Sequence, residues 1–315
     1  MSGRLLAGCG CFNFRKGKIV NIRFSSLAVL VALCSCASAS YAAEEQYQTE
    51  ISALYGRSDF AQDYRLTGIG VLAEVFFAPV KTAEHPYAEA AFLERIGSVR
   101  VMALDVGTKG GGTKTDGRQL LVGVNYAKPD SPLLIQAMYG SQQYDYDTPV
   151  NAVSKGSSIN LNIGNYFTHT LLVGVDYFSS KSKFSYSSYG MPTFYFRHID
   201  YGFSAKYVNE MEHGNALSLY GSLSSSTSDD GIDNLKNTNE HLLVDYYFNP
   251  TLSAGFGIGN SSGEDLHAEN RTYSMNVRHF VAPSVSVSAI YQRYLKKNDG
   301  YDDSKFTQIM MSLRF

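Results

Sequence analysis

The sequence predicts an all-β fold, an antiparallel up-and-down β-barrel of about 14 strands, with 12 or 16 strands also open. Three observations predict it. Short segments alternate apolar and polar residues from Glu50 to Phe315, helical spacing is nowhere sustained, and all eight prolines fall between the expected strands or at the start of one. Successive side chains point to opposite faces of a strand, and proline cannot donate to a sheet ladder.

The first element in chain order is an export signal. Residues 1–43 contain basic but no acidic side chains, then the apolar run 27–33 and small residues that end at Ala42 and Ala43. This order is typical of a secretory signal peptide, which we expect to be cleaved near Ala42 or Ala43. A retained anchor helix is disfavoured because the apolar run is too short to cross a bilayer. Cys34 and Cys36 only faintly match a lipidation site. The basic segment before the apolar run is unusually long, and translation from near Val20 would give the leader a conventional length.

Residues 44–315 are expected to form a single barrel domain. They contain 22 basic and 29 acidic residues, a net charge of about −7, and none of the four cysteines. The lack of thiols excludes a disulfide framework and a thiolate metal site. The near-neutral balance of the whole chain, 27 basic against 29 acidic residues, argues against nucleic acid as a partner.

Turn residues divide this domain into alternating segments. Three of the clearest are 158–164, 251–259 and 284–289, each with apolar side chains on one face and small or polar residues on the other. The expected strands lie near 47–57, 64–77, 86–107, 117–127, 132–146, 157–166, 170–186, 193–208, 214–227, 238–248, 251–261, 268–280, 284–297 and 303–315. The third segment is long and is interrupted at Gly97, so a bulge or a different hairpin is open there.

The two ends of the segments differ, which favours a membrane protein over a soluble sheet. Every even-numbered segment ends in an aromatic residue before a mostly short turn, whereas odd-numbered segments lead into longer polar stretches such as 109–117 and 228–237. Transmembrane barrels have short periplasmic turns, longer outer loops and aromatic girdles at the membrane interfaces. Many segments also exceed the usual strand length of about 5–6 residues. The expected periplasmic girdle consists of Phe77, Tyr126, Tyr166, Tyr207, Phe248 and Phe280.

The last segment places Ile309, Met311, Leu313 and Phe315 on one face. This ending resembles the C-terminal assembly signal of Gram-negative outer-membrane proteins, which implies recognition by the barrel-assembly machinery. In size and strand pattern the exported chain resembles the general bacterial porins, in particular the monomeric fourteen-stranded type. The resemblance implies a transmembrane barrel in the cell outer membrane, surrounded by lipid and lipopolysaccharide. Unlike trimeric porins, the chain has no outer loop long enough to be expected inside the channel; a monomer and a trimer both stay open.

The face opposite the lipid-facing aliphatic residues carries charges of both signs. Such a set suits a hydrated wall whose collective field tunes the passage of solutes, although each member could also merely solvate the wall or pair across it. The expected pore-lining residues are Glu50, Glu74, Glu89, Arg100, Asp176, Asp200, Lys206, Asp245, Arg278 and Arg314. The net charge near −7 predicts a mild preference for cations.

The leading functional hypothesis is a porin, a water-filled channel for passive diffusion of ions and small hydrophilic solutes that needs no cofactor. Eight strands are filled by side chains and sixteen to eighteen leave an aqueous channel, so fourteen lie towards the open end of that range. The alternative is a non-channel outer-membrane barrel with an adhesion or structural role, because inward Leu72, Leu243 and Tyr247 could block the lumen. An enzyme is not expected: the seven histidines lack metal-binding spacing, and 109–117 lacks the spacing of a phosphate loop.

Overall fold

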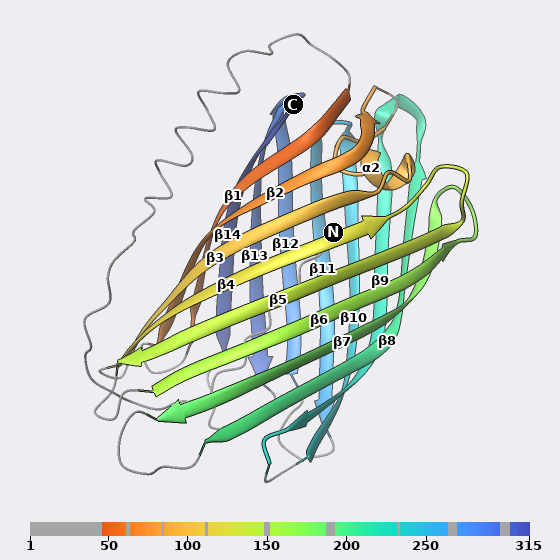
Figure 1. Cartoon of the computed structure of the whole chain (residues 1–315). Helices are drawn as coiled ribbons and strands as arrows, with labels where there is room; N and C mark the ends of the chain where they lie inside the picture. Colours follow the sequence, from red (N-terminus) through yellow and green to blue (C-terminus); the bar gives the residue numbers. More distant parts are fainter. Residues whose placement is uncertain are drawn as a thin grey trace.

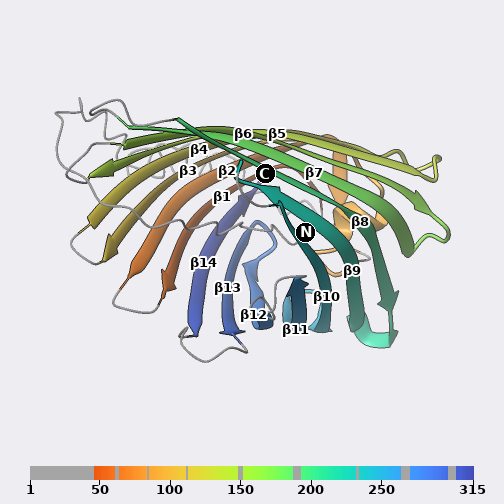
Figure 2. The ribbon, with the colours of Figure 1, turned by 90° about the horizontal axis from the view of Figure 1, so that it is seen from below.

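The computed structural model describes residues 46–60, 64–83, 85–110, 113–147, 152–186, 193–231, 234–263, 270–296 and 303–315. They form a closed barrel in which each strand pairs antiparallel with its neighbours in sequence, and β1 pairs with β14 to close the ring. Figure 1 shows the barrel from the side, and Figure 2 shows the ring of strands from one end. The predicted fold class and the count of 14 strands are confirmed. The expected leader, residues 1–43, lies outside the described residues.

The strands have 11 to 17 residues each, enough to cross a bilayer at a tilt. They are β1 (Gln46–Asp59), β2 (Arg65–Lys81), β3 (Ser98–Gly110), β4 (Thr113–Tyr126), β5 (Leu133–Asp147), β6 (Ala152–Tyr166), β7 (Leu171–Tyr186), β8 (Phe194–Glu210), β9 (Ala216–Asp229), β10 (Asn234–Asn249), β11 (Leu252–Gly263), β12 (Asn270–Ala282), β13 (Val285–Lys296) and β14 (Ser304–Arg314). The helical elements of the described residues are α2 (Ala90–Leu93) and the single 3-10 turn η1 (Glu212–Gly214).

The outer face of the barrel is apolar because every second residue of each strand points outward. On β6, Ile159, Leu161 and Ile163 are 47%, 39% and 57% exposed, while the residues between them point inward. An exposed apolar surface of this extent marks an interaction site, and a ring without edges is the form of sheet that lipid tolerates. Among the described residues, no helix has both the length and the hydropathy to cross a bilayer.

The inner face is polar. Ser52 and Ser312 are fully buried on the two sides of the β1–β14 seam, with their hydroxyl oxygens 2.8 Å apart. Asn162 on β6 donates a hydrogen bond to the carboxylate of Asp176 on β7 at 2.7 Å. Buried serines recur along the inner face of β9, at Ser218, Ser224 and Ser226. The barrel is therefore polar inside and apolar outside, the opposite of a soluble globular domain.

The two ends of the barrel differ. The end that carries Gln46 and Phe315, here named the turn end, lies at the top of Figure 1, and the opposite end is named the loop end. At the loop end the strands continue further than predicted: only residues 111–112 separate β3 from β4, where we expected a loop at 109–117. The same holds for 228–237, since β9 reaches Asp229 and β10 begins at Asn234. These hairpins stay in the sheet because antiparallel strands tolerate water on a face.

The third predicted strand, 86–107, is partly wrong. β3 begins at Ser98, and residues 85–97 lie outside the sheet and fold inward at the turn end. Alternation stops there because Ala90, Leu93 and Ile96, all buried, recur at every third residue, which is the spacing of a helical turn. Gly97 returns the chain to the sheet: a Cβ at this position would lie 2.6 Å from the carbonyl oxygen of Asn125, so only glycine fits.

Candidate functional site: a plug and a polar lumen

Residues 85–97, here named the plug, follow β2 and cross the interior of the barrel at its turn end. Side chains and backbone of the plug contact β6, β8, β10, β12 and β14, strands from around the ring. Figure 1 places α2, which belongs to the plug, beside the turn ends of the strands. A segment held from so many sides occupies the mouth of the barrel at this end.

The base of the plug is an apolar cluster shared with the first two strands. Ala90 and Ile96 pack against Tyr47, Phe76 and Val80, and all five side chains are buried. The rings of Tyr47 and Phe76 meet edge to face with centroids 5.3 Å apart. Burial of such side chains contributes about 1.5–3 kcal/mol for each large one, so this cluster fixes where the plug enters the lumen.

Glu89 ties the centre of the plug to the opposite wall. Its carboxylate accepts hydrogen bonds from the Lys206 ammonium on β8 and, at 2.9 Å, from the Tyr247 hydroxyl on β10. The Lys206 ammonium also lies 4.5 Å from the centre of the Phe92 ring. Burial by itself raises the pKa of Glu89, but the charge of Lys206 and the two hydrogen bonds outweigh it and hold the pKa below its usual range. Glu89 is therefore an ionised anchor of the plug.

Arg314 ties the plug to the seam that closes the barrel. Its Nη1 donates to the carbonyl oxygen of Tyr87 at 2.9 Å, and its Nε donates to the carboxylate of Glu50 at 2.7 Å. The guanidinium lies 4.2 Å from the Tyr47 ring centre and 4.5 Å from that of Phe280, which in turn packs edge to face on Tyr87. One side chain of the last strand thus holds the first strand and the plug together.

A third contact region lies at β6. The Arg95 guanidinium stacks on the Tyr166 ring at 4.4 Å, and Arg95 Nη2 donates to the carbonyl oxygen of Thr168 at 3.1 Å. Phe92 packs against the same Tyr166 ring, with centroids 5.5 Å apart. Stacking of a guanidinium on an aromatic face stabilises such contacts by about 0.5–2 kcal/mol.

His85 links the start of the plug to its far end and to β8. Its Nδ1 lies 2.8 Å from a carboxylate oxygen of Glu210, and its Nε2 lies 3.0 Å from one of Glu94. Both ring nitrogens can donate only when the imidazole is protonated. Burial lowers the pKa of His85, but the hydrogen bonds and charges of the two glutamates outweigh it and raise the pKa above its usual value.

Beside and beyond the plug, the lumen wall is lined by small residues and by rings. Inward positions of β11 are held by glycine, and a Cβ at Gly255 would lie 1.9 Å from the Asp245 carboxylate, so the glycine leaves the space that Asp245 occupies. On the inner face of β5–β8 a row of rings lies near the loop end, with centroid separations of 5.0–6.2 Å. The row consists of Tyr146, Phe184, Tyr186 and Phe194.

The predicted pore-lining residues divide into a wall set and one plug residue. Nine lie on the inward-facing register of the strands: Glu50, Glu74, Arg100, Asp176, Asp200, Lys206, Asp245, Arg278 and Arg314. The tenth, Glu89, differs from the expectation because it directly precedes α2 in the plug and does not lie on a strand. The structure brings Glu50 to Arg314, Glu89 to Lys206, and Glu74 to the Ser98 hydroxyl at 2.6 Å.

Sequence reasoning missed the plug residues themselves. Tyr87, Phe92 and Arg95 lie in the segment 86–107 that was expected to be strand, and His85 directly precedes it. The signal was present in the sequence, because Pro86 and the three-residue recurrence of Ala90, Leu93 and Ile96 do not fit an alternating strand.

Two of the six predicted girdle residues face the lumen. Phe77, Tyr126, Tyr207 and Phe248 are exposed on the outer face, whereas Tyr166 and Phe280 are 6% and 4% exposed and pack on the plug. The placement of these two is wrong because the outward register of β6 runs through Ile163 to Phe167, and that of β12 runs to Val281. The predicted assembly-signal residues Ile309, Met311, Leu313 and Phe315 lie on the outward register of the last strand.

A family model described as "Putative general bacterial porin" matches residues 24–315. The chain belongs to this porin family. Omp33 of Acinetobacter baumannii has a similar structure, with a TM-score of 0.52 at 16% identity over 86% of this chain and 99% of that one. The monoaromatic hydrocarbon channel CymD gives 0.56 at 9% identity over 86% and 89% of the two chains. Identities this low show the fold alone, and no individually curated protein matches the sequence.

The lumen of this porin can offer solutes charges, hydroxyls and amides. Among the described residues, no three His, Cys, Asp or Glu side chains lie close enough together to hold a metal ion. The charged groups of the wall and plug instead pair with one another around the turn-end mouth. The chemistry of the site is therefore that of a polar passage with a plug at one end.

Proposed function

We propose that this porin forms a channel in the cell outer membrane for passive diffusion of ions and small hydrophilic solutes. The loop end faces the outside of the cell and the turn end faces the periplasm. This orientation is favoured because the short turns and both ends of the domain lie at the same end of the barrel. The observation that carries the proposal is the inner wall, which is lined by serines, glycines and charges of both signs within an apolar exterior.

The plug sets how far the periplasmic mouth is open. Glu89 and Arg95 hold the plug to the wall through side-chain hydrogen bonds. These hydrogen bonds can break while the hydrogen bonds between the strands stay intact. A narrow mouth restricts passage to ions and the smallest solutes, and displacement of the plug widens it.

Swelling of liposomes that contain the purified protein tests this proposal with neutral sugars of graded size. We expect slow swelling with the native chain and faster swelling, with a larger size limit, when a short Gly/Ser linker replaces residues 85–95. A matched control carries Lys128→Gln and Asp130→Asn in the exposed segment 128–130, and it should swell like the native chain. Folded barrels of all three that admit no sugar would contradict a diffusion channel.

A barrel with an adhesion or structural role is the second candidate. The plug contacts around the ring and the inward aromatic row both fill part of the lumen, and these two observations favour it. The linker variant separates the two candidates, because a lumen blocked along its length stays closed after the plug has been removed.

A further inference from the structure

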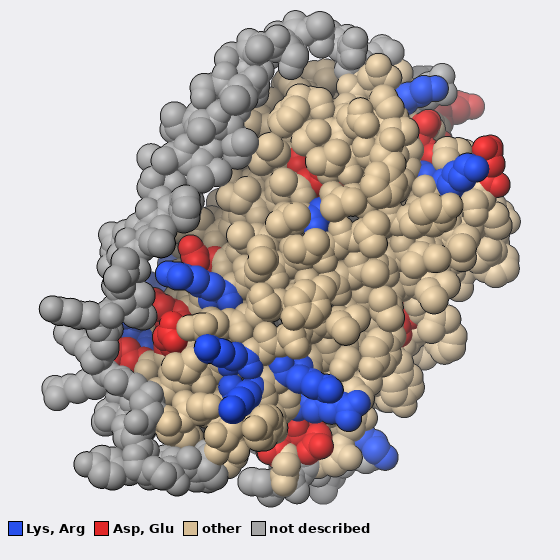
Figure 3. Space-filling view, in the orientation of Figure 1, with Lys and Arg blue, Asp and Glu red and all other residues tan. Residues whose placement is uncertain are grey.

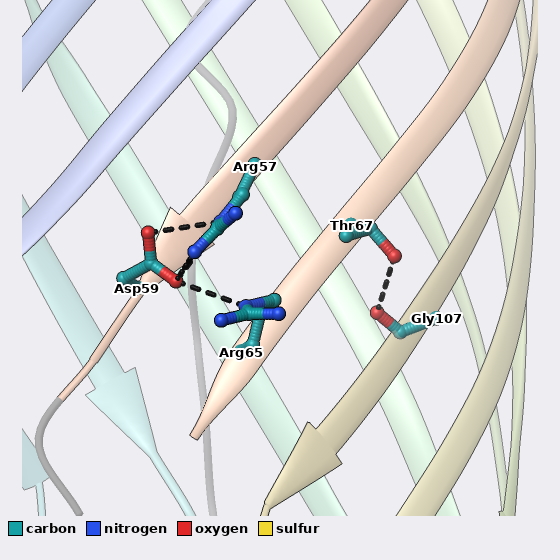
Figure 4. A network of polar contacts seen from close by, with 5 residues as sticks. All are labelled: Arg57, Asp59, Arg65, Thr67 and Gly107. Atoms are coloured by element: carbon teal, nitrogen blue, oxygen red, sulfur yellow. Dashed lines mark hydrogen bonds and ion pairs between the residues drawn. The ribbon is translucent and has the colours of Figure 1, made fainter. Parts of the chain in front are cut away.

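The outer wall carries charged side chains near the loop end, where the apolar surface ends. Some of its cations there pair with neighbouring carboxylates. Arg57 and Arg65 share Asp59, with N–O distances of 2.8 and 3.1 Å (Figure 4). Lys114 pairs with Asp116 at 2.6 Å, and Arg293 pairs with Asp303 at 2.6 Å. Figure 3 shows basic side chains gathered towards the loop end of the face in view, below a broad uncharged surface.

Four cations on three adjacent strands differ from this pattern. They are Lys155 on β6, Lys181 and Lys183 on β7, and Arg197 on β8, here named the cationic cluster. All four are exposed, and within the described residues none has a carboxylate oxygen within 4.0 Å. Their one contact with a side chain in this part of the structure is that of the Lys183 ammonium, 6.0 Å from the centre of the Tyr195 ring.

The nearest acidic side chains are engaged elsewhere. Asp229 is opposite Arg197 in the β8–β9 register, but its Oδ1 accepts a hydrogen bond from the backbone N–H of Gly231 at 2.8 Å. Asp145 is diagonal to Lys155 on β5, and its Oδ1 accepts from Gln143 at 3.2 Å. Neither carboxylate forms an ion pair with the cluster within the described part of the chain.

The register sets like charges against each other. Lys155 is directly opposite Lys183, and Lys181 is directly opposite Arg197. Opposite residues of adjacent strands have Cβ atoms about 4.5–5.5 Å apart, and like charges in that position destabilise a sheet. An arrangement that costs free energy in the isolated chain is stabilised when an anion binds across it.

The height of the cluster points to the nature of the anion. Lys155, Lys181 and Arg197 each lie ten residues along the same outward register from Asn165, Leu171 and Tyr207 at the turn end. Ten residues at about 3.3 Å each, tilted by about 35–45°, rise roughly 25 Å. That matches the apolar band of a transmembrane barrel, so the cluster lies at the level of the lipid headgroups on the loop-end side.

We propose that Lys155, Lys181, Lys183 and Arg197 bind the phosphate-bearing headgroup of lipopolysaccharide in the outer leaflet. Phosphate supplies several acceptor oxygens, which suit the forked guanidinium of Arg197 and the point charges of the three lysines. Tyr195, 63% exposed beside Lys183, presents a ring at the same interface. The site rests on the outer-membrane orientation proposed above, but it is separate from the lumen and from the passage of solutes.

Native mass spectrometry of the purified barrel with lipid A tests the site. The cluster variant carries Lys155→Gln, Lys181→Gln, Lys183→Gln and Arg197→Gln. The matched control carries Arg57→Gln, Arg65→Gln, Lys114→Gln and Arg293→Gln, which removes the same charge from cations that have carboxylate partners. We expect at least about tenfold weaker binding of bisphosphorylated lipid A by the cluster variant, and a change of at most about twofold in the control.

Dephosphorylated lipid A and inorganic phosphate complete the test. Weak binding of dephosphorylated lipid A by the native chain supports the site, whereas binding equal to that of the phosphorylated form overturns it. Displacement of lipid A by millimolar phosphate would assign the cluster to free phosphate and overturn the lipid headgroup. Folding of each variant is checked by the heat-dependent shift in gel mobility. The double variant Lys181→Gln, Arg197→Gln should bind bisphosphorylated lipid A with an affinity between those of the native chain and the cluster variant. Unchanged conductance of the cluster variant separates this site from the channel.

Discussion

At the scale of single residues, the ionised pair of Glu89 and Lys206 decides how firmly the plug is held. Glu89→Gln keeps an acceptor for Tyr247 but removes the ion-pair partner of Lys206, whose side chain is 17% exposed. Loss of one partner of a buried pair costs on the order of 3 kcal/mol, so we expect the plug to open more often. Single-channel recordings should show a higher open probability than with Asp130→Asn, an exposed carboxylate of the same end. Equal open probabilities would contradict the anchoring role.

His85 gives the plug a dependence on pH with a defined sign. Glu210 and Glu94 raise its pKa above the ordinary value although burial opposes them. The stabilisation is thus fully present below about pH 6.5, the unfolded pKa, and is lost as pH rises through the higher folded pKa. We expect conductance to increase from about pH 6 to pH 8, measured in planar bilayers. His85→Gln should remove this increase; a native pH profile in that variant would exclude His85 as the cause.

At the scale of elements, neighbouring aromatic residues at the end of β6 have different roles. Tyr166 faces inward against Phe92 and Arg95, whereas Phe167 is 67% exposed on the outer face. Tyr166→Ala should raise the conductance by loosening the plug and leave membrane insertion intact. Phe167→Ala should reduce the yield of inserted barrel, because it removes an interfacial ring, and leave conductance unchanged. Conductance and the fraction of heat-modifiable protein in vesicles measure the two effects, and a reversed outcome would contradict the assigned faces.

The strands could be predicted from the sequence because each strand alternates apolar and polar residues over many positions. The alternation of Ile159, Leu161 and Ile163 fixes both the strand and its outward face, and it already implied that Tyr166, of opposite parity, points inward. The ends of the strands could not be predicted, since polar residues such as those of 109–117 suit a hydrated strand as well as a loop. The plug was missed because its partners, Lys206 and Arg314, are distant in sequence.

At the scale of the whole molecule, closure of the ring places one set of charged side chains on the lumen side and another on the outer wall. The wall and plug set contains six carboxylates, from Glu50 to Asp245, and four cations, from Arg100 to Arg314. An excess of negative charge along a lumen favours cations. We expect a mild cation preference of the native chain, measured as the reversal potential in a KCl gradient. Anion selectivity would contradict the assignment of these side chains to the passage.

Single-channel conductance of the native chain beside the linker variant is the decisive measurement for a water-filled barrel with a plug at its periplasmic mouth. We expect small or infrequent steps for the native protein and larger, stable steps once residues 85–95 are replaced. Two correctly folded barrels that both give no steps would contradict the channel, and two identical large conductances would contradict the plug.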